Sequence, residues 1–157
     1  MDAQQFLDEI LKPTLEKMEM HSPAAEKLLL MTACHESGGF VYERQVGGPA
    51  VSFYQIEPNT LNDLYENYLS FRPERQALLD QFKPSEDCSL DEALMDRVFA
   101  TAAARLIYAR VAEALPSFDD DEGMGRYCKK YWNTEAGKAT PEKYINDWLR
   151  YKPENYA

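Results

Sequence analysis

The residues best suited to chemistry lie in one stretch, between positions 32 and 60. Glu36 ends an apolar segment there, and Ser37 and two glycines, Gly38 and Gly39, follow it. A carboxylate at the last turn of a buried helix lies where core meets cleft, and partial desolvation raises its pKa. Such a group can donate and accept a proton near neutral pH. We therefore expect Glu36 to be a general acid/base, against the alternative of a solvated glutamate near a helix end.

The helix that positions Glu36 is predicted to begin at Ser22 and Pro23, because serine is a favourable N-cap and proline suits the first helical position. Apolar residues then recur at helical spacing between positions 25 and 33, and Glu36 shares the face that points inward. This period places the acid at the core end of a cleft. His35 lies one step round the helix, and we expect a structural role for it.

Two further motifs follow Glu36 in the chain. The first is a loop, PAVSFYQIEPNT at positions 49 to 60, which contains Gln55. The second is the pair Trp132-Asn133, with Gly137 nearby. Each motif alone is a weak signal, and the information lies in their order and spacing.

Together the three motifs resemble the lytic transglycosylase and goose-type lysozyme superfamily, in the version found in bacteriophage virion and tail proteins. The resemblance covers about residues 24 to 150, which is most of the chain. The sequence departs from the family at Pro49 and Ser52, where glycine is usual, and at Tyr54, where methionine is common. These changes narrow the expected cleft but keep the glutamate and the glutamine.

The resemblance implies a mainly α fold, a lysozyme-like helical domain. Residues 22–150 would form its catalytic core, and residues 38 to 58 a small loop or β-hairpin lobe that is one wall of the cleft. It also implies peptidoglycan glycan strands as the partner, and a reaction without a metal or organic cofactor. The substrate-binding residues carried over from the family are Ser37, Tyr54, Gln55, Trp132, Asn133 and Tyr144.

The mechanism depends on the number of carboxylates. Most glycosidases need an acid and a second carboxylate about 5 to 9.5 Å away. A lytic transglycosylase needs one, because the C6 hydroxyl of the muramic acid attacks the anomeric carbon itself. The resemblance favours this single-acid route with Glu36. Glu57 and Glu43 lie in the same lobe, and either could instead position a water in a hydrolysing lysozyme.

Length and composition limit the remaining possibilities. The chain has 157 residues, which suits one domain, 1–157. Its net charge of -10 argues against nucleic acid as a partner, because such binding depends on Lys and Arg. No stretch approaches the roughly 18 apolar residues of a membrane span. The three cysteines are widely spaced, form no metal motif and are typical of reduced thiols made in the cytosol.

Two other helices are predicted with less bearing on the site. Residues 1–20 have the pattern of an N-terminal amphipathic helix, interrupted at Pro13. Ser89 and Glu92 form a capping box, which predicts that one apolar helix continues from there to Val111.

The first residues lack the basic and apolar regions of a secretory signal. We therefore expect a protein made in the host cytoplasm, for which a phage particle or a holin would provide the way to the periplasm and cell wall. The resemblance implies a phage virion, with other virion or tail proteins as partners. Two other functions remain open: a virion structural or adaptor protein that keeps the fold without activity, and a sugar-binding module. An open groove around Glu36, Gln55 and Asn133 would favour the enzyme.

Overall fold

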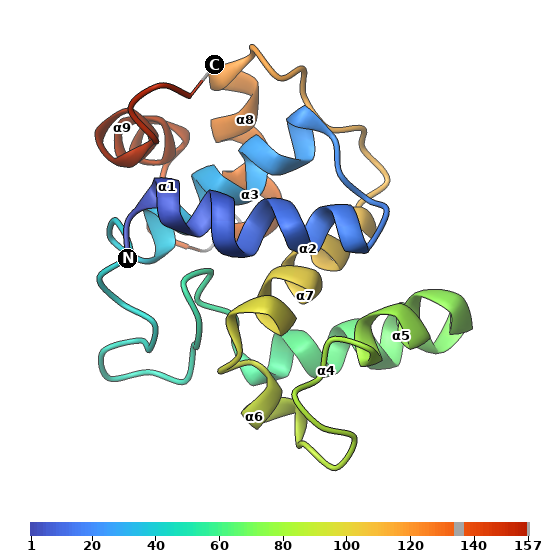
Figure 1. The fold of residues 1–157 in the computed structure, drawn as a ribbon. Helices are drawn as coiled ribbons and strands as arrows, with labels where there is room; N and C mark the ends of the chain where they lie inside the picture. The colour runs from blue at the N-terminus through green and yellow to red at the C-terminus, as the bar shows by residue number, and fades with distance from the viewer. Residues whose placement is uncertain (134–136, 157) are drawn as a thin grey trace.

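A computed structural model describes residues 1–133 and 137–156, and these are mainly helical (Figure 1). The α-helices are α1 (Ala3–Phe6), α2 (Lys12–Lys17), α3 (Pro23–Glu36), α4 (Pro58–Asn67), α5 (Pro73–Asp80), α6 (Leu90–Ala93), α7 (Arg97–Ala109), α8 (Asp121–Cys128) and α9 (Pro141–Tyr151). Short turns of other helical type are Leu7–Leu11 and Lys129–Asn133, both π-helical, and the 3-10 turn Leu69–Phe71. No helix within the described ranges has the length and apolar character needed to cross a membrane.

Helix α3 is the centre of the molecule. It begins as predicted, with the Ser22 hydroxyl accepting a hydrogen bond from the backbone N–H of Ala25 and with Pro23 in its first turn. Every residue from Ala25 to Cys34 is buried, so the helix is enclosed on all sides. Helices α7, α8 and α9 contact it. Glu36, the last residue of α3, therefore lies at the border of the core.

The N-terminal segment packs on this core. The sequence predicts a kink or break before Pro13, and the helix does change there without ending: it widens into the π-helical turn Leu7–Leu11 and continues into α2, whose first turn contains the proline. Proline has no N–H to donate, and the widened π-helical turn just before Pro13 is where the continuous helix accommodates it. Phe6, Leu11 and Leu15 are buried, and the segment contacts α7.

The expected single helix after Ser89 is two helices. The Ser89 hydroxyl accepts from the N–H of Glu92, but α6 is only four residues long and ends at Ala93. The carboxylate of Asp96 then caps a new helix, α7, by accepting from the N–H of Phe99. An aspartate side chain competes with the helix backbone for hydrogen bonds, which is why it starts a helix here instead of continuing one.

The segment between α3 and α4 is a loop, seen in teal in Figure 1. Two isolated β-bridges, Arg44 with Val51 and Val51 with Ile56, are its only β-structure, and no strand is present in the described part of the chain. The β-hairpin form of the expected lobe is therefore absent there, and the loop form is what the chain adopts. The left-handed backbone of Ser52 and Gln55 interrupts a regular ladder.

Helix α7 joins two groups of helices. It contacts α2 and α3 on one side and α5 on the other (Figure 1). One hydrophobic cluster runs through the chain from Ala3 to Trp148 and includes residues of all these elements. The groups are thus held by a continuous core, and the loop between α3 and α4 lies along it.

Candidate functional site

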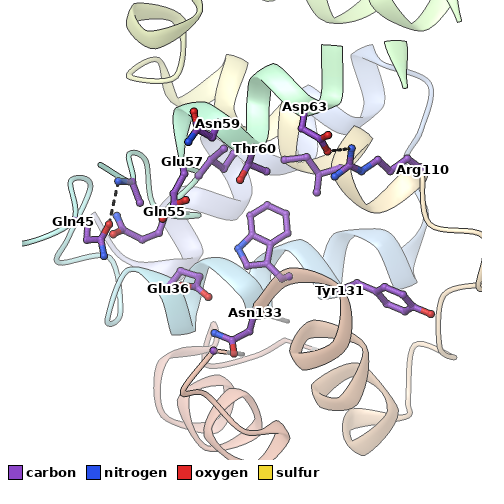
Figure 2. A pocket seen from close by; sticks show the side chains of 15 residues that line it. Glu36, Gln45, Gln55, Glu57, Asn59, Thr60, Asp63, Arg110, Tyr131 and Asn133 are labelled. Carbon is purple, nitrogen blue, oxygen red and sulfur yellow. Dashed lines mark hydrogen bonds and ion pairs between the residues drawn. The ribbon is translucent and has the colours of Figure 1, made fainter. Parts of the chain in front are cut away.

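A groove of about 810 Å³ opens beside the end of α3. Its lining comes from segments far apart in the sequence: Glu36 of α3, Gln55 and Glu57 of the loop, and Trp132 and Asn133 of the π-helical turn. Figure 2 shows Glu36 at one end with Gln55 and Asn133 on either side of it. Of the residues predicted from sequence, the structure brings these five together.

Glu36 is held from one side by helix α9. The Tyr144 hydroxyl donates a hydrogen bond of 2.9 Å to Oε2 of Glu36. Burial raises the pKa of the Glu36 carboxyl, while the neighbouring His35 and the Tyr144 hydrogen bond act in the opposite direction. Desolvation is the largest of these effects, so the protonated form of Glu36 is favoured relative to a glutamate in water.

His35 supports this arrangement from behind the groove. Its Nδ1 lies 2.6 Å from Oδ2 of Asp147, and its ring packs on the Tyr144 ring with centroids 4.1 Å apart. The structural role expected for His35 is therefore filled by a contact to α9. Asp147 was not among the predicted residues, and no local pattern marks it, because its partner lies 112 positions earlier.

Gln55 reaches the groove through an unusual backbone. Its φ of 53° and the φ of 77° at Ser52 both lie in the left-handed region. The Gln55 amide nitrogen donates to the carbonyl oxygen of Ser52 at 2.8 Å, which ties the side chain to its own turn. For a residue other than glycine, a left-handed backbone conformation costs free energy and persists only where the surrounding structure holds it. Such residues cluster at binding sites.

The opposite wall is tied to this loop by Trp132. Its indole N–H donates to the carbonyl oxygen of Tyr54 at 3.1 Å, a contact between residues 78 positions apart. The Trp132 ring also packs on Tyr108 of α7, with centroids 5.0 Å apart. Trp132 thus lines the groove and also joins the loop, the π-helical turn and the core.

Besides Tyr144, which is buried and contacts Glu36 from α9 without lining the groove, three predicted residues lie elsewhere. Ser37 is fully buried, and its hydroxyl donates to the carbonyl oxygen of Ala33 at 2.6 Å and accepts from the N–H of Phe40 at 2.7 Å. Tyr54 is 1% exposed, and its hydroxyl lies 3.0 Å from that of Thr101. Both side chains support the groove from inside and do not line it.

The third is Glu43, which is bound by α7. Its two carboxylate oxygens accept from Nε and Nη2 of Arg97 at 3.0 and 2.6 Å. This paired contact aims the carboxylate at Arg97, and Glu43 is not part of the groove lining. Of the two candidates for a second carboxylate, only Glu57 lines the groove.

The far end of the groove holds residues that the sequence did not single out. Arg110 donates from Nη1 to Oδ2 of Asp63 at 2.7 Å, and Thr60 of α4 lies between this pair and Glu57 (Figure 2). The pair joins α4 to the residue that ends α7, so only the folded chain brings it together. Its position gives the groove a polar end away from Glu36.

The described ranges contain no group of three His, Cys, Asp or Glu side chains placed to hold a metal ion. The groove offers carboxyl, amide and aromatic side chains instead. Comparison of the chain with protein families, with curated proteins and with solved structures found no match.

Proposed function

We propose that this protein cleaves the MurNAc–GlcNAc β-1,4 bond of peptidoglycan, with Glu36 as the single general acid/base. The observation that carries the proposal is the state of Glu36. Its carboxyl has a pKa raised by burial, is oriented by Tyr144, and lies in a groove of about 810 Å³. A buried carboxylic acid that borders an open groove is the arrangement required to protonate a glycosidic oxygen.

The proposed reaction has two steps. Protonated Glu36 donates its proton to the oxygen that leaves as the bond to the anomeric carbon breaks. The Glu36 carboxylate then takes the proton of the C6 hydroxyl of the same muramic acid, whose oxygen bonds to the anomeric carbon. The products are a free GlcNAc hydroxyl and a 1,6-anhydro ring, and Glu36 regains its proton. No water is consumed, so one carboxyl group is sufficient.

The groove supports an enzyme over an adaptor protein that keeps only the fold. It is open to solvent, and Gln55 and Asn133 flank Glu36, as a site that holds a polar substrate requires (Figure 2). The helical arrangement, with its acid at the end of a central helix and its loop wall, is proposed to be lysozyme-like. The sequence resemblance extends the proposal to a phage virion as the carrier, which mass spectrometry of purified particles would test.

A hydrolysing lysozyme is the second candidate, because Glu57 also lines the groove. In that reaction Glu57 would position the water that attacks the anomeric carbon. The two reactions leave different ends on the glycan: anhydromuramyl ends from the first and reducing muramyl ends from the second.

Mass spectrometry of muropeptides released from purified peptidoglycan distinguishes them. We expect anhydromuramyl products from the wild type and none from Glu36→Gln, with both proteins folded as judged by circular dichroism. Reducing ends that disappear in Glu36→Gln would keep the site and move the mechanism to hydrolysis. Wild-type activity in Glu36→Gln would overturn the assignment. No release by a folded wild type would favour the structural role.

A further inference from the structure

The amide of Asn133 is held from behind by a lysine. Lys129 and Asn133 are the first and last residues of the π-helical turn, and Nζ of Lys129 donates to Oδ1 of Asn133 at 2.9 Å. The same ammonium group donates to the carbonyl oxygen of Gly137, also at 2.9 Å. One charged group therefore fixes both the Asn133 side chain and the backbone that returns beside it.

Gly137 provides the space for this contact. A Cβ atom at position 137 would lie 2.2 Å from Oδ1 of Asn133 and 2.6 Å from its Cγ. It would also lie 2.7 Å from the backbone oxygen of Asn133, so any other residue would displace the Asn133 amide, its backbone, or both. The glycine is thus required by the close approach of a side chain that lines the groove.

The contact determines what Asn133 offers to a ligand. An asparagine amide has one oxygen, which accepts, and one nitrogen with two N–H groups, which donate. By binding the oxygen, Lys129 fixes which way round the amide lies, with the nitrogen at the end away from the ammonium group. In Figure 2 the Asn133 nitrogen lies on the side nearer to Glu36. The groove therefore presents a hydrogen-bond donor of fixed direction next to the acid.

We propose that Lys129 is a positioning residue, which aims the N–H groups of Asn133 at an acceptor oxygen of the bound substrate beside Glu36. Lys129 itself does not line the groove and acts through Asn133. The identity of the substrate rests on the proposed function, whereas the orientation of Asn133 by Lys129 does not. Gly137 contributes to the same positioning, because the absence of a side chain there leaves room for the Asn133 amide.

A double-mutant cycle tests whether the lysine acts through the asparagine. The variants are Lys129→Met, which keeps the length and removes the charge, Asn133→Ala, and the two combined. Lys130→Met is the matched control, because the neighbouring Lys130 is exposed and does not contact Asn133 or Glu36: its partners are Glu113, outside the groove, and the ring of Tyr131. Gly137→Ala displaces the same amide with Lys129 intact. Rates of muropeptide release and thermal unfolding are measured for each.

We expect Lys129→Met, Asn133→Ala and Gly137→Ala each to lower the rate about tenfold, the usual effect of one lost hydrogen bond. The double variant should be no slower than Asn133→Ala, and Lys130→Met should match the wild type. Losses that multiply to about hundredfold in the double variant would overturn the proposal. A wild-type rate in Lys129→Met would do the same.

An NMR measurement separates this inference from the proposed function. The side-chain amide signal of Asn133, assigned by its loss in Asn133→Ala, should move in Lys129→Met and stay in place in Lys130→Met. An unchanged signal in Lys129→Met overturns the positioning role. If the wild type releases no muropeptides while the signal moves, the proposed substrate is wrong and the positioning of Asn133 stands.

Discussion

The Tyr144 hydroxyl donates a 2.9 Å hydrogen bond to the Glu36 carboxylate, from the first turn of α9 to the last residue of α3. Tyr144 is fully buried, and its ring packs on His35, which is bound in turn to Asp147. Two turns of α9 thus hold the end of α3 at two places. This contact determines both the direction of the Glu36 carboxyl and part of its acidity.

Replacing Tyr144 by phenylalanine removes the hydroxyl and keeps the ring. The hydrogen bond lowers the pKa of Glu36, so Tyr144→Phe should raise that pKa further. A general acid works only while protonated, and activity falls as pH rises through its pKa. We therefore expect the alkaline limb of the pH–rate profile to move to higher pH, together with a stability loss of about 1 kcal/mol.

The matched control is Tyr65→Phe. The hydroxyl of Tyr65 also donates to a carboxylate, to Oδ1 of Asp80 at 2.8 Å, but neither Tyr65 nor Asp80 lines the groove. The control should lose similar stability while its pH–rate profile stays at the wild-type position. If the pH–rate profile of Tyr144→Phe coincides with that of the wild type, Tyr144 does not influence the pKa of Glu36.

Glu36 should reduce stability at neutral pH. Its pKa is raised by folding above the ordinary 4.5, so the folded state binds the proton more tightly than the unfolded chain. The stability that this tighter proton binding contributes is complete below the pKa of Glu36 in the unfolded chain. It is lost as pH rises through the pKa of Glu36 in the folded protein. Glutamine does not titrate, so Glu36→Gln should gain stability over the wild type from pH 4 to pH 8.

Urea unfolding at several pH values, with the variant beside the wild type, measures this difference directly. Glu66→Gln is the control, because it removes the same kind of carboxyl group from an exposed position on α4, outside the groove. A difference between wild type and Glu36→Gln that is constant from pH 4 to pH 8 would contradict the raised pKa.

Ser52 tests the strained loop beside Gln55. Its φ of 77° disfavours any residue with a Cβ, and its hydroxyl accepts from the N–H of Tyr54 at 3.1 Å. Ser52→Ala loses the hydrogen bond and keeps the strain of a Cβ-bearing residue in the left-handed region. Ser52→Gly also loses the hydrogen bond, but it relieves that strain. We expect the glycine variant to be more stable than the alanine variant by about 1 kcal/mol in urea unfolding. Equal stabilities would mean that the backbone conformation costs nothing here.

The two candidate second carboxylates should respond differently to substitution. Glu43 is bound to Arg97 away from the groove, so Glu43→Gln should keep the wild-type rate and cost less than about 1 kcal/mol of stability. Glu57→Gln alters the groove and should still yield anhydromuramyl products under the single-acid reaction. Loss of all products in Glu57→Gln, at unchanged stability, would instead assign Glu57 to the chemistry.

The local features of the fold could be predicted from the sequence. The start of α3 at Ser22 and Pro23, and its end at Glu36 before two glycines, follow from capping chemistry and hydrophobic period, which act within a few residues. The mainly helical class follows in the same way. The capping signal at Ser89 leads us to expect one long helix, whereas the side chain of Asp96 caps a second helix within that stretch.

The site depends on contacts that no local pattern contains. Tyr54 and Glu43 have the types expected of ligand contacts, yet one lies in the core against Thr101 and the other is bound by Arg97. Asp147 shows the opposite case, a residue without a local signal that supports the site through His35.

Capping chemistry and hydrophobic period therefore predict which acid ends a helix, and the motif spacing predicts which amides accompany it. Which side chains face the groove depends on how the chain folds. Burial and pairing of a side chain depend on partners about 50 to 110 positions away, and these meet only when α3, α7 and α9 pack together. The raised pKa of Glu36 has the same origin, because desolvation is a property of the assembled core.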